Sequence, residues 1–293
     1  MSILAGVVRR DAHAVIDDAL CEALRRGISR NAADERIEFR DEGAYFVKVD
    51  VGAYDRPAHR RAASGSFSML AGEPLPLGEG IDDERRDVQL RLLHDRLDEA
   101  RLDVLRCASG TFCAAYYDPR RQTAYLIADR LGLRPLYYAI DGELVYFASA
   151  MRILESLPAL QKTMDVVSVV EMTGFGYPFG GGTPYAGITM LQACEIVAVS
   201  PDAIRSSRYF AWDSLRPSML TEQEALQRTF DKFSSAVRRR LRGDRNVAAY
   251  LSGGLDSSSV VAMMSGLASE PVKTYTIGFE DSGFDETPYA ATL

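Results

Sequence analysis

The sequence predicts two domains of different architecture: a mixed α and β domain with a mostly antiparallel sheet, followed by a βαβ unit of a parallel sheet. Two observations predict this. Short apolar runs bounded by turn residues recur along residues 1–200, whereas a helix, a strand, a second helix and a second strand follow beyond residue 220. The length of 293 residues, 47% of them hydrophobic and 26% charged, is ordinary for two globular domains.

The first domain is predicted from its apolar runs. Asp141-Gly142 joins two of them and is typical of a β-hairpin. The predicted strands are residues 3–8, 44–49, 111–117, 123–128, 136–140, 144–148 and 188–199. Apolar residues at helical spacing predict helices at residues 14–26, 85–97 and 166–172.

A polar stretch with proline at residues 213–218 separates the two domains, which we place at 1–215 and 216–293. The second domain begins with a helix that runs to about residue 242. Thr221 with Glu224 three residues later forms a capping-box pattern at its start. A strand at residues 247–251, a helix to about residue 267 and a strand at residues 273–279 complete a βαβ unit.

The turn between that strand and helix is the most informative segment. It reads Ser252-Gly253-Gly254-Leu255-Asp256-Ser257-Ser258. Two glycines allow a phosphate to approach the backbone, and the N–H groups at a helix N-terminus bind anions. Asp256 next to phosphates requires a divalent cation, so it is a candidate Mg²⁺ ligand. The alternative is a Gly-Gly turn in which Ser or Asp only caps the helix.

Composition limits the possible functions. The net charge of −7 argues against a general nucleic-acid partner, and the basic run at residues 238–240 is typical of a solvated helix end. No segment approaches the roughly 18 apolar residues that span a membrane, so we expect a cytoplasmic protein with no membrane partner. The dispersed cysteines lack metal-ligand spacing and are expected to be buried thiols: Cys21, Cys107, Cys113 and Cys194.

The loop at residues 252–258 resembles the pyrophosphate-binding loop of the ATP pyrophosphatases, in the version carried by asparagine synthetases and their relatives. Other segments resemble the same family in the same order. They are residues 109–113 with Tyr117-Asp118, 129–138, 187–191, 208–210 with Trp212, 275–279 and 284–290. The resemblance therefore covers nearly the whole chain.

This resemblance implies an α+β, N-terminal-nucleophile-type αββα sandwich of the glutaminase type, followed by the first βαβ of an α/β ATP-pyrophosphatase domain. It also implies ATP and Mg²⁺, because family members activate a carboxylate with ATP for attack by an amine. By position, the diphosphate is expected to be bound by Ser252, Gly253, Gly254, Asp256 and Ser257. Asp256 would also bind Mg²⁺, and Leu251 and Ile277 would line the adenine pocket.

Asp285 and Glu286 are further candidates for a nucleotide or substrate role. Their alternative is a helix N-terminus with acidic residues in its first turn. The resemblance also implies that the synthetase domain is incomplete at Leu293, so we expect the chain to be truncated and to bind ATP weakly or not at all by itself.

The nucleophile position departs from the family. Members that hydrolyse glutamine carry Cys after the initiator Met, with the freed α-amine as base. Here that position is Ser2, a degenerate nucleophile whose hydroxyl is far less acidic than a thiol. The family's glutamine-binding segment is not visible either, and residues 65–75 look like the diverged form of lasso-peptide cyclases. We therefore predict an inactive glutaminase.

These observations predict an ATP-dependent carbon–nitrogen ligase that joins a small-molecule or peptide carboxylate to an amine. Without glutamine hydrolysis, an amine on the same substrate is favoured, as in lasso-peptide cyclisation with a precursor peptide and a protease partner. A glutamine-hydrolysing asparagine synthetase is the alternative within the family. The alternative of another class is an inactive fragment or binding module that keeps only half of an ATP site.

Overall fold

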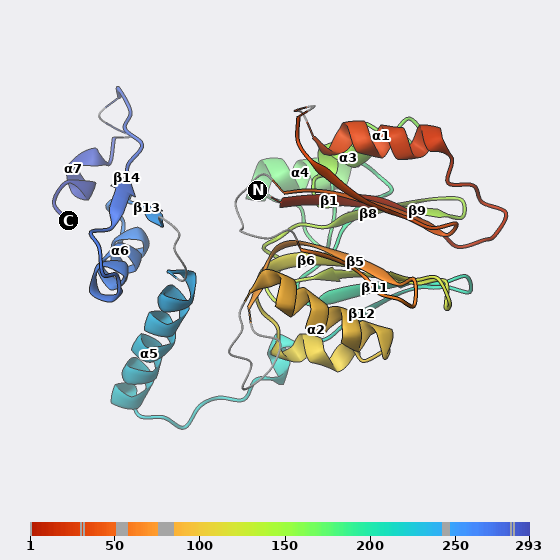
Figure 1. Ribbon diagram of the computed structural model, residues 1–293. Coiled ribbons are helices and arrows are strands. Elements are labelled where there is room, and N and C mark those ends of the chain that lie inside the picture. Colours follow the sequence, from red (N-terminus) through yellow and green to blue (C-terminus); the bar gives the residue numbers. More distant parts are fainter. Residues whose placement is uncertain are drawn as a thin grey trace. The chain divides into compact units, whose positions relative to one another are not determined.

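The computed structural model describes residues 2–29, 31, 33–50, 58–75, 85–241, 247–281, 283 and 285–293. The chain forms two compact units, Met1–Leu215 and Arg216–Leu293 (Figure 1).

The first unit contains two six-stranded sheets whose strand pairs are antiparallel. In spatial order, the first sheet comprises β10 (Ile188–Met190), β8 (Tyr137–Asp141), β9 (Leu144–Ala148), β1 (Ser2–Arg9), β3 (Ala44–Asp50) and β2 (Arg36–Arg40). The second comprises β12 (Ile204–Arg208), β11 (Glu195–Val199), β7 (Thr123–Ala128), β6 (Ser109–Asp118), β5 (Phe67–Leu75) and β4 (His59–Arg61).

Three apolar clusters hold these sheets and their helices in four layers (Figure 1). One lies between the sheets and includes Phe46 and Phe67, whose rings meet edge to face at 4.9 Å. The second joins the first sheet to α1 (Asp18–Ile28) and α3 (Met151–Glu155). The third joins the second sheet to α2 (Arg86–Asp98) and the 3-10 helix η1 (Leu102–Cys107). The predicted αββα sandwich is therefore confirmed.

The helix predicted at residues 166–172 is α4 (Val166–Phe175). The Asp165 side chain accepts hydrogen bonds from the first-turn amides, and Gly176 ends the helix with a φ of 81°. Its valines do not enter the core, because Val166, Val167 and Val170 are all exposed while Ser168 is buried. The helical periodicity was sufficient to predict the helix but not which face is buried.

Asp129 organises the connection between the two sheets at the end of β7. One oxygen of its buried carboxylate accepts from the amides of Leu131 at 2.9 Å and Leu133 at 3.1 Å. The other accepts from the amides of Phe112 at 3.1 Å and Arg134 at 2.9 Å. This side chain thereby fixes the loop that leads from β7 in one sheet to β8 in the other.

The single strand predicted at residues 188–199 is wrong. β10 and β11 occupy this segment, but they belong to different sheets. A turn separates them, in which the amide of Glu195 donates to the carbonyl of Gln192 at 3.1 Å. Cys194 there has a φ of 62°, a left-handed conformation that interrupts extended backbone. A continuous apolar pattern hid this turn.

The second unit begins with α5 (Glu222–Arg240), and Thr221 and Glu224 form the predicted capping box. Residue 242, the predicted end of this helix, lies outside the described residues. β13 (Ala248–Tyr250) and β14 (Lys273–Tyr275) pair in parallel and are connected through α6 (Leu255–Leu267). The predicted βαβ unit is therefore present, followed by the short helix α7 (Thr287–Ala290).

The second strand of this unit is shorter than the predicted residues 273–279, because β14 ends at Tyr275. The Thr276 hydroxyl, and not a backbone amide, then bonds the carbonyl of Leu251. The backbone at residues 276–279 has therefore left the ladder. An apolar pattern with Ile277 and Phe279 did not reveal this, since both side chains are exposed.

Candidate functional site

The loop at residues 252–258 connects β13 to α6, as the sequence predicts. Gly254 is the N-cap residue of α6, and no side chain caps the helix there. Gly254, Leu255 and Asp256 are exposed, so the start of this helix faces solvent.

The backbone amides of this loop are largely unused. Within the described residues, the N–H groups of Gly253, Leu255, Asp256 and Ser257 have no hydrogen-bond acceptor. The amide of Ser258 is the first in α6 to donate to a main-chain carbonyl, that of Gly254, at 3.1 Å. Free amides at a helix N-terminus carry partial positive charge and bind phosphate.

The serine hydroxyls fix the shape of the loop. The Ser252 and Ser257 hydroxyls are 3.0 Å apart, and the amide of Ser252 donates to the Ser257 oxygen at 3.2 Å. The hydroxyl of Ser258 donates to the carbonyl of Gly254 at 2.6 Å. Ser252 and Ser257 therefore bind each other across the loop, and both remain close to the free amides.

The twin glycines serve different purposes. Gly253 has a φ of 81°, and a Cβ there would lie 2.5 Å from the Cβ of Tyr289 and 2.8 Å from the amide nitrogen of Ala290. The backbone of α7 therefore occupies the space beside Gly253. Gly254 has an ordinary φ of −71°, and a Cβ there would meet only the Ser252 hydroxyl, at 3.4 Å.

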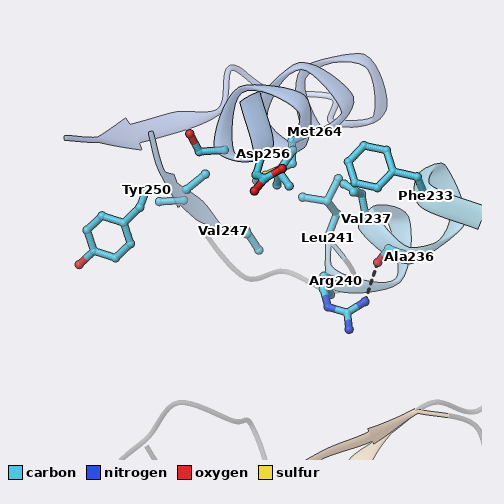
Figure 2. Close-up of a pocket in the computed structure, with 13 residues that line it drawn as sticks. Phe233, Ala236, Val237, Arg240, Leu241, Val247, Tyr250, Asp256 and Met264 are labelled. Carbon is cyan, nitrogen blue, oxygen red and sulfur yellow. Dashed lines mark hydrogen bonds between the residues drawn. The ribbon is translucent and has the colours of Figure 1, made fainter. Parts of the chain in front are cut away.

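Asp256 lies in the first turn of α6, and its side chain is exposed. It also borders a pocket of about 570 Å³ between α5, β13 and α6. Figure 2 shows Asp256 and Met264 on α6, opposite Val237 and Phe233 on α5. The pocket is lined by Phe233, Ala236, Val237, Arg240, Leu241, Val247, Ala248, Ala249, Tyr250, Asp256, Ser257, Val260 and Met264.

A magnesium ion bound to phosphate fits this arrangement. Mg²⁺ is usually held by one or two carboxylates together with substrate phosphates and water. Asp256 supplies one exposed carboxylate in the same helical turn as the free amides. The described residues contain no cluster of three or more His, Cys, Asp or Glu side chains that could bind a metal. Asp256 would therefore share the ion with a phosphate ligand.

The residues predicted to line an adenine pocket differ in exposure. Leu251 is buried, and both of its backbone polar groups have partners: its amide donates to Tyr275 at 2.9 Å, and its carbonyl accepts from Thr276 at 2.8 Å. Ile277 is exposed. Adenine recognition by these two residues stays a prediction.

Asp285 and Glu286 precede α7. The Asp285 carboxylate accepts from the amide of Thr287 at 3.1 Å and from its hydroxyl at 2.7 Å. These hydrogen bonds lower the pKa of Asp285. They agree with the alternative interpretation of Asp285, in which the carboxylate stabilises a helix N-terminus. Phe284, in the same matching segment, lies outside the described residues.

Ser2 lies at the start of β1 in the other unit, where it pairs with Asp50 of β3 and is only 2% exposed. Lys48 Nζ donates to Ser2 Oγ at 2.5 Å and to the carbonyl of Leu70 at 2.6 Å. Arg86 Nη2 donates to the same two oxygens at 3.0 and 3.1 Å. Two cationic side chains therefore converge on the hydroxyl.

Asp50 completes this group, which we call the Ser2 cluster (Ser2, Lys48, Asp50, Leu70 and Arg86). Its carboxylate lies 2.9 Å from Lys48 Nζ and 3.1 Å from Arg86 Nη2. Burial and the neighbouring Arg86 charge lower the pKa of Lys48 to about 7, although Asp50 opposes this shift. Burial would raise the pKa of Asp50, but the charges of Lys48 and Arg86 outweigh it, so this pKa is lowered.

Two protein-family models match the chain, one in each unit. The model of the glutamine amidotransferase domain matches residues 92–210, and that of asparagine synthase matches residues 229–293. Both matches agree with the resemblance to the asparagine synthetase superfamily. The asparagine synthase match includes the loop at residues 252–258.

Individual proteins are also similar to this chain. Asparagine synthetase [glutamine-hydrolyzing] 3 of Bacillus subtilis is 28% identical over 196 residues, which are 65% of this chain and 32% of the relative. Putative asparagine synthetase [glutamine-hydrolyzing] 2 of Methanocaldococcus jannaschii is 29% identical over 194 residues, 64% of this chain and 37% of the relative. The chain thus spans about a third of the length of these relatives.

One solved structure shows a weak overall similarity to the chain. The glutamine phosphoribosylpyrophosphate amidotransferase from B. subtilis is 13% identical, with a TM-score of 0.37, over 94% of this chain and 60% of that chain. None of the described helices is long and apolar enough to cross a membrane.

Sequence reasoning missed several residues of the Ser2 cluster and one residue that contacts the position directly before the loop at residues 252–258. Lys48 and Asp50 alternate along β3, which places both side chains on one face, so their spacing could have indicated a charged site inside an apolar strand. Arg86 lies 84 positions from Ser2, and no local pattern connects the two. Thr276 was read only as part of a strand.

Proposed function

We propose that this chain carries the diphosphate-binding part of an ATP-dependent amide synthetase, which activates a carboxylate for attack by an amine. The supporting observation is the exposed start of α6, where four loop amides have no acceptor among the described residues and Asp256 lies beside them. In such a reaction ATP supplies the adenylyl group that activates the carboxylate, and diphosphate leaves.

The residues of the loop have separate tasks in this proposal. The amides of Gly253, Leu255 and Asp256 bind the diphosphate oxygens, since a helix N-terminus stabilises negative charge. The hydroxyls of Ser252 and Ser257 add donors at the edge of the loop. Asp256 would hold Mg²⁺ between its carboxylate and the diphosphate, which removes the repulsion between the two anions.

The glutaminase site of this synthetase is proposed to be inactive. Ser2 Oγ accepts hydrogen bonds from both Lys48 and Arg86, and the residue is almost fully buried. Lys48 Nζ lies within 3 Å of three acceptor atoms, and in this arrangement it donates a hydrogen bond to Ser2 Oγ and does not accept the proton of that hydroxyl. A serine hydroxyl without a base in the correct protonation state is a poor nucleophile.

The amine must then come from another source, and we propose an amine on the substrate itself. Ring closure of a peptide, as in lasso-peptide cyclisation, meets this requirement, with a precursor peptide and a protease as partners. All four cysteines are free thiols, which supports a reducing compartment such as the cytoplasm.

Titration of the full chain with Mg²⁺ and inorganic pyrophosphate tests the proposal, with ¹⁵N-labelled protein so that weak binding is still measured. We expect the amide signals of Gly253, Leu255 and Asp256 to shift. Asp256→Asn should weaken Mg²⁺-dependent binding by about tenfold, or about 1.4 kcal/mol. Glu270→Gln, which changes an exposed acid beyond the C-terminal end of α6, is the control. Unshifted loop signals in the wild-type chain would leave a binding module as the better description.

A second measurement addresses glutamine. We expect no glutamate release from glutamine by the wild-type chain or by Ser2→Cys, because Lys48 and Arg86 still surround that position. Glutamine hydrolysis by the wild type would overturn the proposed inactivity.

A second candidate function is synthesis of asparagine, which the names of the B. subtilis and M. jannaschii relatives favour. ATP–pyrophosphate exchange distinguishes the two candidates. Exchange stimulated by aspartate and not by a peptide with a free N-terminal amine and an acidic side chain supports asparagine synthesis. The opposite result supports cyclisation.

A further inference from the structure

The phosphate-binding loop is held in place by the segment that follows β14. Leu251, the last residue before the loop, has both backbone groups bonded to this segment. Its amide donates to the carbonyl of Tyr275 at 2.9 Å, and its carbonyl accepts from the Thr276 hydroxyl at 2.8 Å. Thr276 is the only donor to that carbonyl in the part of the chain that the structure describes.

The Thr276 hydroxyl acts where the ladder between the two strands ends. The last paired residues of β13 and β14 are Tyr250 and Tyr275, so no backbone amide of β14 continues to Leu251. A carbonyl at a buried residue such as Leu251 needs a donor, because an unpaired buried acceptor is costly. Thr276 supplies that donor at the point where the chain turns into the loop.

The same segment contacts the loop a second time, at Gly253. The backbone of α7 lies so close that a Cβ at Gly253 would be 2.5 Å from the Cβ of Tyr289. α7 is itself fixed at its start, where Asp285 accepts from both the amide and the hydroxyl of Thr287. Residues 251–253 are thus held at one end by a hydroxyl and at the other by a helix backbone.

We propose that Thr276 is a positioning residue for diphosphate binding: through the carbonyl of Leu251 it sets the direction in which the loop leaves β13, and α7 fixes that direction at Gly253. This inference rests on the proposed function, since it concerns the same loop. It assigns Thr276 a role through Leu251 and no contact with the diphosphate itself. The positions of the free amides beyond Gly253 are then set before any ligand arrives.

Three variants of the full chain separate the hydroxyl from the shape of the side chain. Thr276→Val keeps the β-branched shape and removes the donor, and Thr276→Ser keeps the donor and removes a methyl group. Thr274→Val makes the same change on β14 at a hydroxyl that has no hydrogen bond among the described residues. The probe is Mg²⁺ with inorganic pyrophosphate, and the readouts are affinity and the ¹⁵N amide signals of the loop without ligand.

We expect Thr276→Val to weaken pyrophosphate binding by about tenfold, which equals about 1.4 kcal/mol. It should also move the ligand-free amide signals of Gly253 and Leu255, whereas Thr276→Ser and Thr274→Val leave both affinity and signals near the wild type. Equal affinity of Thr276→Val and wild type overturns the inference, as does a loss in Thr276→Ser that matches the loss in Thr276→Val.

If the proposed function is wrong, the binding data and the amide signals of the variants give a different result. If the wild-type chain does not bind pyrophosphate, the proposed function falls, and the ligand-free signals still decide the positioning role. Unchanged loop signals in Thr276→Val then overturn that role, and moved signals that Thr276→Ser restores support it.

Discussion

Ser2 and the loop at residues 252–258 both bring polar groups together. Lys48 and Arg86 enclose Ser2, whereas four amides of the loop have no acceptor within the part of the chain that the structure describes. The Ser2 cluster is buried and its cations bond acceptors of the protein itself. The start of α6 is exposed, and the loop serine hydroxyls form hydrogen bonds with each other and with the backbone of Gly254. A site whose donors are already bonded internally contributes to stability, whereas one with free donors is available to a ligand.

The largest expected effect is on the enclosed site. Lys48→Met should destabilise the chain by about 3–5 kcal/mol, because it removes a buried cation that bonds Asp50, Ser2 and Leu70. Urea unfolding measures this change. Lys162→Met, at an exposed lysine of the same unit, is the matched control and should cost less than about 1 kcal/mol. A small loss of stability in Lys48→Met would show that the Ser2 cluster does not hold these strands together.

Substitutions at Gly253 and Gly254 test whether either glycine of the loop is needed for stability. Gly253→Ala should destabilise the second unit by about 2 kcal/mol, because a left-handed φ disfavours alanine and the backbone of α7 leaves no room for a Cβ. Gly254→Ala should change stability by less than about 0.5 kcal/mol. Urea unfolding read from the amide signals of α6 compares the two. Equal costs would contradict the different purposes assigned to the glycines.

A substitution at the N-cap position of α6 should stabilise the helix and at the same time prevent pyrophosphate binding. Gly254→Asp should stabilise α6 by up to about 1 kcal/mol, because its carboxylate accepts from the first-turn amides. The same carboxylate should abolish pyrophosphate binding by occupying those amides. Gly254→Asn, a neutral cap, separates occupation from charge repulsion. Thermal unfolding and pyrophosphate titration are measured on the same samples, and retained binding in Gly254→Asp would place the anion elsewhere.

The smallest expected effect is the pH dependence of stability in the first unit. His94 is fully buried, and its Nδ1 and Nε2 lie 2.8 and 3.1 Å from the hydroxyls of Ser68 and Ser66. Burial lowers the pKa of His94 below 6.5, so the unfolded chain binds the proton more readily. Stability should therefore rise with pH through about 6.5 and fall below it, by about 0.5–1 kcal/mol between pH 7.5 and 5.

His94→Gln is expected to remove most of this pH dependence in urea unfolding. His13→Gln, at an exposed histidine, should leave it unchanged. His59 also has a lowered pKa from burial and from Lys48, so part of the slope should persist in His94→Gln. A slope of the opposite sign would mean that His94 is charged in the folded chain.

The sequence was sufficient where a local pattern determines the structure. The Thr221 and Glu224 capping box, the parallel pair around residues 252–258 and the hairpin at Asp141-Gly142 each depend on neighbours in sequence. It failed for β5, which was not predicted because Gly72 and Pro74 are unusual in a strand, yet β5 pairs with β6 over nine residue pairs. Two flanking strands compensate for both residues.

Long-range contacts explain the other misses. Strands β2, β4 and β12 carry several polar residues each, and only their pairing partners make them strands. In the Ser2 cluster, Lys48 and Arg86 meet Ser2 only through the fold, so the sequence could indicate the departure at Ser2 but not what surrounds it. Thr276 acts through a hydroxyl that replaces a ladder bond, which no strand pattern encodes.

One residue, Asp129, fixes the loop that connects β7 in one sheet to β8 in the other. Each of its oxygens accepts from two amides, a requirement that an asparagine with a single accepting oxygen does not meet. The side chains of Leu131 and Leu133, whose amides it binds, are more than half exposed. The side chains at positions 131 and 133 are therefore free to vary during evolution or redesign, provided that Asp129 stays to hold their amides and Gly132 keeps its left-handed φ of 65°.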